Sequence, residues 1–313
     1  MKKILRDIWG LLKDAAIRWS DDHAGTLGAA LAFYTAFSLA PLLIIAIVLS
    51  SLGFGQDAVR GHLDNQIQGL IGKDGAQFVQ MLIENAYKSD SSVLAAIFGI
   101  IALLIGASGV FVQLRESLNA IWHVREKPLP TIVAILRTRM VSFAMILGVG
   151  FLLLVSLIVS TVLSAASGLI SSSMPFLEPL LPIIDLLVSF TGITFTFALI
   201  FKYIPDVVVS WRDVIVGAAA TSFLFSLGKL AIGFYLGNSA AGSTFGAASS
   251  LVIILLWAYY SSQIILYGAE FTRVFATRFG SGFQPGRNAL QTVEKVIEPK
   301  SPARNVGARR VGT

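Results

Sequence analysis

The chain has 313 residues, of which 55% are hydrophobic and only 13% are charged. A soluble domain carries about 25% charged residues, so this composition excludes a water-soluble globular protein. There is no cysteine, which excludes disulfides, thiol nucleophiles and thiolate metal sites. We therefore expect an integral membrane protein.

The N-terminal segment, residues 1–26, is charged and carries a helical stripe of apolar residues. Leu5, Ile8, Leu12 and Ala15 recur at the spacing of one helix face. This pattern predicts an amphipathic helix on the membrane surface rather than a cleaved signal, because the charges leave no apolar signal core. We interpret the following Asp21-Asp22-His23 as a helix cap, with a metal or acid/base cluster as the alternative.

Long uncharged runs predict the membrane spans, since a helix needs about 20 apolar residues to cross the hydrocarbon core. Residues 55–90 are predicted to form an amphipathic loop on the outer side, and residues 276–313 a disordered basic tail. The predicted fold class is all-α, with six transmembrane helices. Their predicted ranges are about 27–54, 91–114, 140–165, 180–204, 214–237 and 247–271.

The distribution of lysine and arginine predicts the orientation. Nearly all of them lie in the N-terminal segment, in the loops after the second and fourth spans, and in the tail. The opposite side carries only Arg60, Lys73 and Lys88. Because positive loops stay inside, both termini are predicted to be cytoplasmic. This bias accounts for the basic pI of about 9.6, so we expect anionic inner-leaflet lipids as partners and not nucleic acid.

Ionisable residues inside predicted spans are the candidates for a polar site. Lys229 lies within the fifth span, where a lysine costs about 2.5–3.5 kcal/mol. We predict that it pairs with Asp185 or faces a wet cavity; the alternative is that it reaches the outer interface. Glu270 ends the sixth span, three residues before Arg273. We interpret these two as an interfacial ion pair rather than a proton relay.

Proline and glycine mark a bend and packing faces. Pro41, in the middle of the first span, predicts a kink, with a hinge as the functional alternative. Trp122 is expected near a membrane interface, where aromatic residues are common. Small residues spaced for close contact predict faces that pack within the chain, with a homodimer seam as the alternative. The glycines at these positions are Gly28, Gly99, Gly106, Gly233 and Gly237.

No catalytic constellation is visible. The histidines His23, His62 and His123 lie far apart and offer no metal-ligand pair at helical spacing. The sequence has no phosphate-binding glycine loop, and the segments outside the spans are too short for a separate catalytic domain. We therefore expect no cofactor, no metal and no enzyme activity.

Four stretches resemble the YihY/virulence factor BrkB family of bacterial inner-membrane proteins. They are residues 29–42, residues 118–122, Leu227-Gly228-Lys229, and the run from Phe245-Gly246-Ala247 to Gly268-Ala269-Glu270. Phe245 stands where the family usually has tyrosine. The resemblance implies six helices with both ends in the cytoplasm. Members have also carried the name ribonuclease BN, but the clustered ligands of a metal-dependent nuclease are absent from the sequence.

Three functions follow as hypotheses. The first is a transporter-like protein or conduit with a polar site within the helix bundle. The second is a non-catalytic envelope protein that maintains integrity or organises partners. The third, a membrane ribonuclease, has the least support. Neither the substrate nor the oligomeric state can be read from the sequence.

Overall fold

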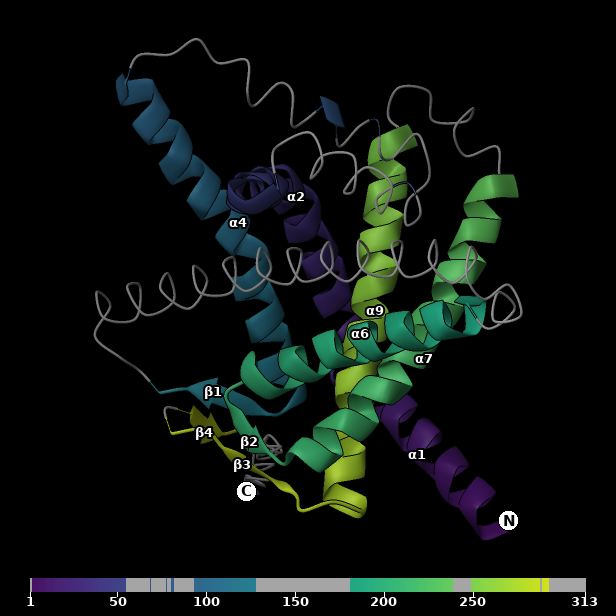
Figure 1. Ribbon diagram of the computed structural model, residues 1–313. Coiled ribbons are helices and arrows are strands. Elements are labelled where there is room, and N and C mark those ends of the chain that lie inside the picture. Colours follow the sequence, from purple (N-terminus) through teal and green to yellow (C-terminus); the bar gives the residue numbers. More distant parts are fainter. Residues whose placement is uncertain are drawn as a thin grey trace, which may run out of the picture.

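The computed structural model describes residues 2–54, 68, 77, 80–81, 93–127, 181–238, 249–287 and 289–292. Most of these residues are helical (Figure 1). The helices are α1 (Lys2–Asp21), α2 (Ala24–Phe54), α4 (Val93–Ile121), α6 (Leu181–Tyr203), α7 (Trp211–Asn238) and α9 (Ser249–Arg278). The strands are β1 (Val124–Glu126), β2 (Val207–Val209), β3 (Phe283–Pro285) and β4 (Ala289–Gln291).

The helices coincide with most of the predicted spans. Helices α2, α4, α6, α7 and α9 cover the first, second, fourth, fifth and sixth. In the described part of the chain, three segments are long and apolar enough to cross a membrane, namely Leu186–Tyr203, Trp211–Ala231 and Leu251–Arg278. The third predicted span, 140–165, and most of the loop 55–90 lie outside the described residues. The count of six therefore stays a prediction.

The expectation of a purely helical chain with a disordered tail is wrong over residues 276–291. Helix α9 continues to Arg278, and the chain beyond it forms β3 and β4. Strand β4 pairs antiparallel with β1, and β3 pairs antiparallel with β2. Three-residue strands are too short to give an alternating pattern in the sequence, and these are held by long-range pairing. Residues 293–313 lie outside the described residues.

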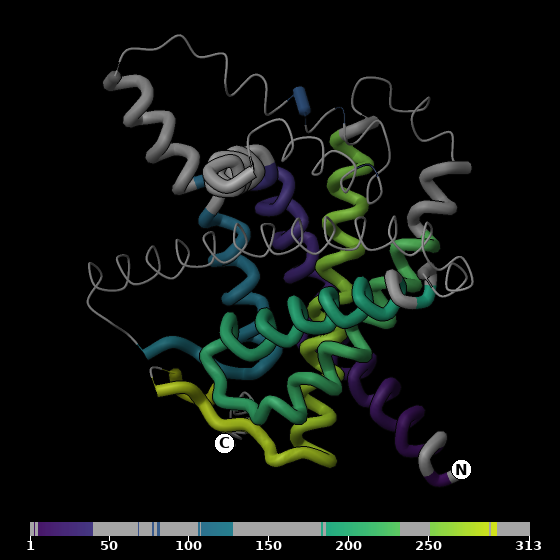
Figure 2. The backbone as a smooth tube through the Cα atoms, viewed as in Figure 1, coloured from purple at the N-terminus to yellow at the C-terminus, as the bar shows by residue number. Residues whose placement is uncertain are grey.

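Helix α9 is the centre of the helical packing. It contacts α1, α2, α4 and α7, while α2 also packs on α4 and α7 on α6. Helix α1 and the four strands lie at the same end of α9 (Figure 2), so residues distant in sequence meet there. The largest fully buried side chains include Trp122, Phe201, Leu118 and Leu266.

Trp122 corrects one expectation. It is fully buried rather than at an interface, and its ring meets that of Phe283 edge-on at 5.0 Å between centroids. The β3 strand supplies this cover. The sequence did not indicate that the tail returns to the end of α4, and for this reason the indole was assigned to the membrane surface.

Close helix contacts at glycine occur at one of the predicted positions and at others that were missed. A Cβ on Gly28 would lie 2.9 Å from Cδ of Gln263 on α9, which confirms Gly28 as a packing residue. Gly106 lies in α4, where its carbonyl accepts a hydrogen bond from the Ser38 hydroxyl of α2. Gly99 lies in α4, Gly233 and Gly237 lie in α7, and Pro41 lies within α2, but their packing is not among the described contacts.

The contact between α7 and α9 rests on a reciprocal pair that the sequence analysis missed. Gly217 and Thr221 on α7 face Gly268 and Thr272 on α9. A Cβ on Gly217 would lie 2.7 Å from Cβ of Thr272, and a Cβ on Gly268 would lie 2.9 Å from Cβ of Thr221. Each threonine hydroxyl donates to the carbonyl four residues earlier, at 2.7 Å, so no buried hydroxyl is left unpaired.

Candidate functional site

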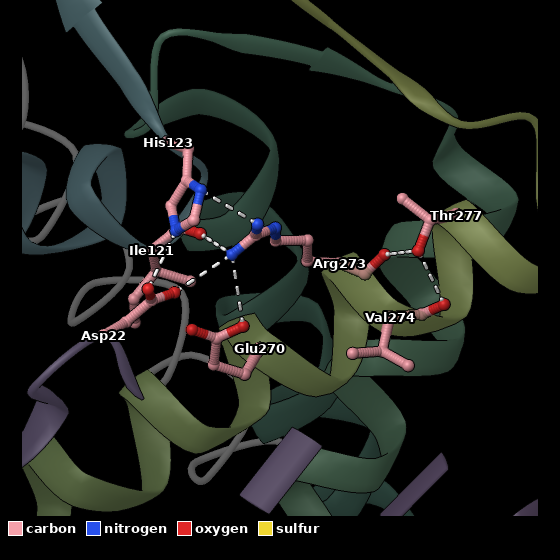
Figure 3. A network of polar contacts seen from close by, with 7 residues as sticks. All are labelled: Asp22, Ile121, His123, Glu270, Arg273, Val274 and Thr277. Carbon is pink, nitrogen blue, oxygen red and sulfur yellow. Dashed lines mark hydrogen bonds and ion pairs between the residues drawn. The ribbon is translucent and has the colours of Figure 1, made fainter. Parts of the chain in front are cut away.

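Four ionisable side chains from three parts of the chain meet where α1, α4 and α9 converge (Figure 3). Asp22 lies in the turn between α1 and α2, His123 directly follows α4, and Glu270 and Arg273 lie one turn apart on α9. We call these four residues the polar centre. Glu270 is fully buried, and Arg273 is only 7% exposed.

Arg273 connects the polar centre. Its Nη1 donates to Asp22 Oδ2 at 3.0 Å and to the carbonyl oxygen of Ile121 at 2.6 Å. Its Nη2 lies 3.2 Å from His123 Nδ1, and Nη1 forms an ion pair with Glu270 Oε2 at 3.6 Å. The guanidinium thereby neutralises a carboxylate and satisfies a carbonyl at the C-terminal end of α4, where a cation is favourable.

The tautomer of His123 follows from its two partners. Its Nε2 lies 2.8 Å from Asp22 Oδ1, and its Nδ1 faces Arg273. A guanidinium can only donate hydrogen bonds, so Nδ1 is the acceptor and carries no proton. The ring proton is therefore on Nε2, which donates to the Asp22 carboxylate.

Glu270 is the side chain with unmet bonding capacity. Within the described structure neither of its carboxyl oxygens has a hydrogen-bond partner, and the ion pair with Arg273 is longer than a hydrogen bond. Buried polar atoms are nearly always hydrogen-bonded, so an exception of this kind calls for an explanation.

Asp22 is the ionised carboxylate of the polar centre. Burial acts to raise its pKa, but the neighbouring Glu270 carboxyl, the His123 ring and the Arg273 guanidinium act in the opposite direction and prevail. The pKa of Asp22 therefore lies below its ordinary value of 3.8. At neutral pH the Asp22 carboxylate is charged and holds both His123 and Arg273.

The interpretation of Asp22 as a helix cap is wrong. Its two oxygens bind His123 and Arg273, and α2 instead begins on the His23 carbonyl, which accepts from the amides of Thr26 and Leu27. Among the described residues no group of three or more His, Asp or Glu side chains is placed to hold a metal ion. The predicted Glu270–Arg273 ion pair is present, but it is buried rather than interfacial.

Lys229 and Asp185, the other predicted polar candidates, are not part of the polar centre. Lys229 is exposed on α7, beside the equally exposed Leu227 and Leu230. Asp185 lies in α6, but its side chain is outside the described set. Their pairing therefore stays a prediction.

A second polar cluster at the same end of α4 is fully bonded. Arg115 donates to both carboxylate oxygens of Asp206, with distances of 2.8–3.1 Å, and also pairs with Glu126. Asn119 donates to Asp206 at 2.9 Å and accepts from its backbone amide at 2.8 Å. This cluster fixes the loop between α6 and β2 to α4, and its completeness contrasts with Glu270.

Sequence reasoning missed His123 as a site residue and counted Arg273 only as part of the basic tail. A signal was nevertheless present. The charge distribution already assigned the turn before the first span, the loop after the second and the end of the sixth to one side of the membrane. It did not specify which of these helix ends touch.

Comparison with known proteins gives a consistent family. A family model described as virulence factor BrkB matches residues 15–291. A UPF0761 membrane protein of Rhodospirillum centenum is 26% identical over 297 residues, covering 94% of this chain and 64% of the relative. One of Verminephrobacter eiseniae is 28% identical, covering 90% and 66%. One of Alteromonas mediterranea is 26% identical, covering 86% and 87%.

The chain spans just under two thirds of the length of the first two of these relatives. No solved structure matches it.

Proposed function

We propose that this chain, which belongs to the virulence factor BrkB family and is a membrane protein, acts as a transporter-like protein or conduit whose ion- or solute-binding site is the polar centre. Asp22 and Glu270 supply the acceptor oxygens, Arg273 supplies a fixed positive charge, and His123 links them to the end of α4. The proposed location is the cytoplasmic end of the bundle in a bacterial inner membrane.

The observation that carries this proposal is the state of Glu270. A carboxyl group at the end of a membrane-length helix is fully buried, yet neither oxygen has a hydrogen-bond partner in the described structure. Ionisable residues in transmembrane segments are costly and generally mark ion or substrate pathways. A carboxyl group with free acceptor capacity can take a proton, a cation or a hydrogen-bond donor from a solute.

The alternative, a non-catalytic envelope protein that organises partners, predicts polar clusters that serve only to hold helices together. The Arg115–Asp206 cluster has this character, because each of the two side chains meets several bonding partners. The polar centre differs in leaving Glu270 incompletely bonded. This difference favours a binding role over a purely structural one.

We further propose that the chain is not an enzyme, despite the ribonuclease name carried by some relatives. The described side chains give no metal-binding group of three. Lys229 and Asp185 are kept as candidates for a second polar position along the pathway. Assembly into a homo-oligomer through the small-residue faces, and contact of the basic end with anionic lipids, belong to the same proposal.

Flux through proteoliposomes tests the proposal. Purified full-length protein is reconstituted and the liposomes are given gradients of protons, potassium, chloride and phosphate in separate runs. At least one gradient is expected to collapse faster than in protein-free liposomes. If none of the four does, the transport proposal fails and the partner-organising alternative is favoured.

A further inference from the structure

His123 combines an unfavourable backbone conformation with a bridging side chain. Its φ of 51° lies in the left-handed region, which favours glycine at the end of a helix. Among the described residues only one other non-glycine residue, His23, has a positive φ, also 51°. His23 is exposed, whereas the His123 ring spans Asp22 and Arg273. A strained residue in a ligand-like cluster is a reason to look for a role of its side chain.

The contact between His123 and Arg273 exists only while His123 Nδ1 has no proton. That nitrogen accepts from Arg273 Nη2 at 3.2 Å. A proton on Nδ1 would place two donors of like charge against each other. Imidazole is the side chain that gains a proton between about pH 5 and 8 in water, and the His123 side chain is 41% exposed, so water reaches it.

The displaced guanidinium has a second acceptor within reach. Glu270 Oε2 lies 3.6 Å from Arg273 Nη1, and neither Glu270 oxygen is hydrogen-bonded within the described structure. A small movement of Arg273 away from the imidazole would convert this long ion pair into direct hydrogen bonds. The polar centre therefore contains two mutually exclusive partners for one face of the same guanidinium.

The other charges around the ring act in known directions. Asp22, from the α1–α2 turn, accepts from Nε2 and favours a charged imidazolium. Arg273, from α9, opposes it, and Arg18 of α1 adds a positive charge near Glu270. The carbonyl of His123 accepts from the Thr292 amide beyond β4, which holds the backbone in place while the side chain changes partner.

We infer that His123 is a proton-binding residue, and that protonation of its Nδ1 transfers the Arg273 guanidinium from His123 to Glu270. The proton comes from water at the exposed edge of the ring. The transfer removes the side-chain contact between the end of α4 and α9, so the two helix ends separate. The inference rests on the proposed function in one respect: it names the proton as the ion that drives the polar centre.

Distance measurement by electron paramagnetic resonance tests this inference without any transport assay. The native chain has no cysteine, so spin labels can be attached to Ala120→Cys on α4 and Thr277→Cys on α9. Both positions are exposed. The full chain is measured in nanodiscs from about pH 8 to 5. The label–label distance distribution is expected to shift to longer distances as the pH falls.

Three variants of the doubly labelled protein assign the shift. His123→Gln keeps a donor and an acceptor but takes no proton, so it is expected to abolish the shift. His23→Gln, the matched control with the same backbone conformation, is expected to retain it. Glu270→Gln removes the charged acceptor and is expected to reduce the shift, which provides a second reading if His123→Gln does not fold.

An unchanged distance in the wild-type protein between pH 8 and 5 overturns the inference, as does a full shift in His123→Gln. The two proposals fail separately. A pH-dependent shift in a protein that moves no solute leaves the proton-binding residue in place and removes the transporter. Flux without the shift leaves the transporter and removes the proton switch.

Discussion

Glu270 and Asp22 show how two carboxyl groups in one cluster can have different roles. Asp22 accepts from both His123 and Arg273, whereas Glu270 is buried with a single ion pair at 3.6 Å. The first group holds three segments of the chain together. The second retains bonding capacity inside the fold, which is the property expected of a binding group.

Replacing Asp22 by Asn is expected to lower the stability of the protein by about 1.5–3 kcal/mol, the usual contribution of hydrogen bonds to charged groups. Because the folded protein lowers the pKa of Asp22 below 3.8, the unfolded chain binds the proton more readily. The stabilisation is present above pH 3.8 and is lost as the pH falls through the lower, folded-state value.

Thermal unfolding in detergent, followed by circular dichroism from pH 7 downward, checks the Asp22 prediction. The unfolding temperatures of wild type and Asp22→Asn should differ at pH 7 and converge at acidic pH. A difference that is constant over the whole range would show that the ionised carboxylate is not the cause.

Replacing Glu270 by Gln is expected to leave the unfolding temperature unchanged or slightly raised. The change removes a buried group that can carry charge but has no hydrogen bond to lose, and Arg273 keeps its bonds to Asp22 and Ile121. A loss of more than about 3 kcal/mol in the same unfolding assay would indicate a structural ion pair instead.

At the scale of the elements, the crossing of α7 and α9 depends on two glycines that each face a threonine. The Thr272 side chain is short, so it cannot swing away from a methyl group placed on Gly217. Gly192 on α6 is a contrasting case, because a Cβ there would meet nothing within 4 Å.

Gly217→Ala is expected to destabilise the protein by about 1–3 kcal/mol through overpacking. Gly192→Ala is the matched control and is expected to be neutral or stabilising, because alanine favours a helix more than glycine does. Denaturant titration of the two variants in the same detergent measures both effects. Equal stabilities would mean that α7 and α9 do not cross as closely as described.

The positions of the helices could be predicted from the sequence, whereas the contacts between them could not. Apolar run length locates α2, α4, α6, α7 and α9, since lipid requires long helices. The pairing of β1 with β4 and the meeting of Asp22, His123 and Arg273 depend on which helix ends approach one another. One sequence carries little information on such long-range contacts. Arg273 was therefore assigned to the tail and Asp22 to a cap.

At the scale of the whole molecule, β3 and β4 join the chain beyond α9 to the loops after α4 and α6. Segments joined by backbone pairing have to lie on one side of a membrane. This arrangement agrees with the positive charge in the same loops, from which a cytoplasmic position was predicted.

Single cysteines at Arg125, Val208 and Gln284, all exposed in these three segments, test the common side. A membrane-impermeant maleimide added to intact cells is expected to label none of them, and to label all three after the inner membrane is opened. Labelling of any one position in intact cells would contradict the pairing or the predicted orientation.

The central claim is that the Glu270 carboxyl group is the binding group for whatever the protein moves. The most direct test is the flux of the ion that wild-type proteoliposomes transport, compared between Glu270→Gln and the control Gly192→Ala at equal reconstituted amounts. The account predicts at least about a tenfold loss of flux for Glu270→Gln, corresponding to about 1.4 kcal/mol, and wild-type flux for Gly192→Ala. Wild-type flux through Glu270→Gln would contradict it.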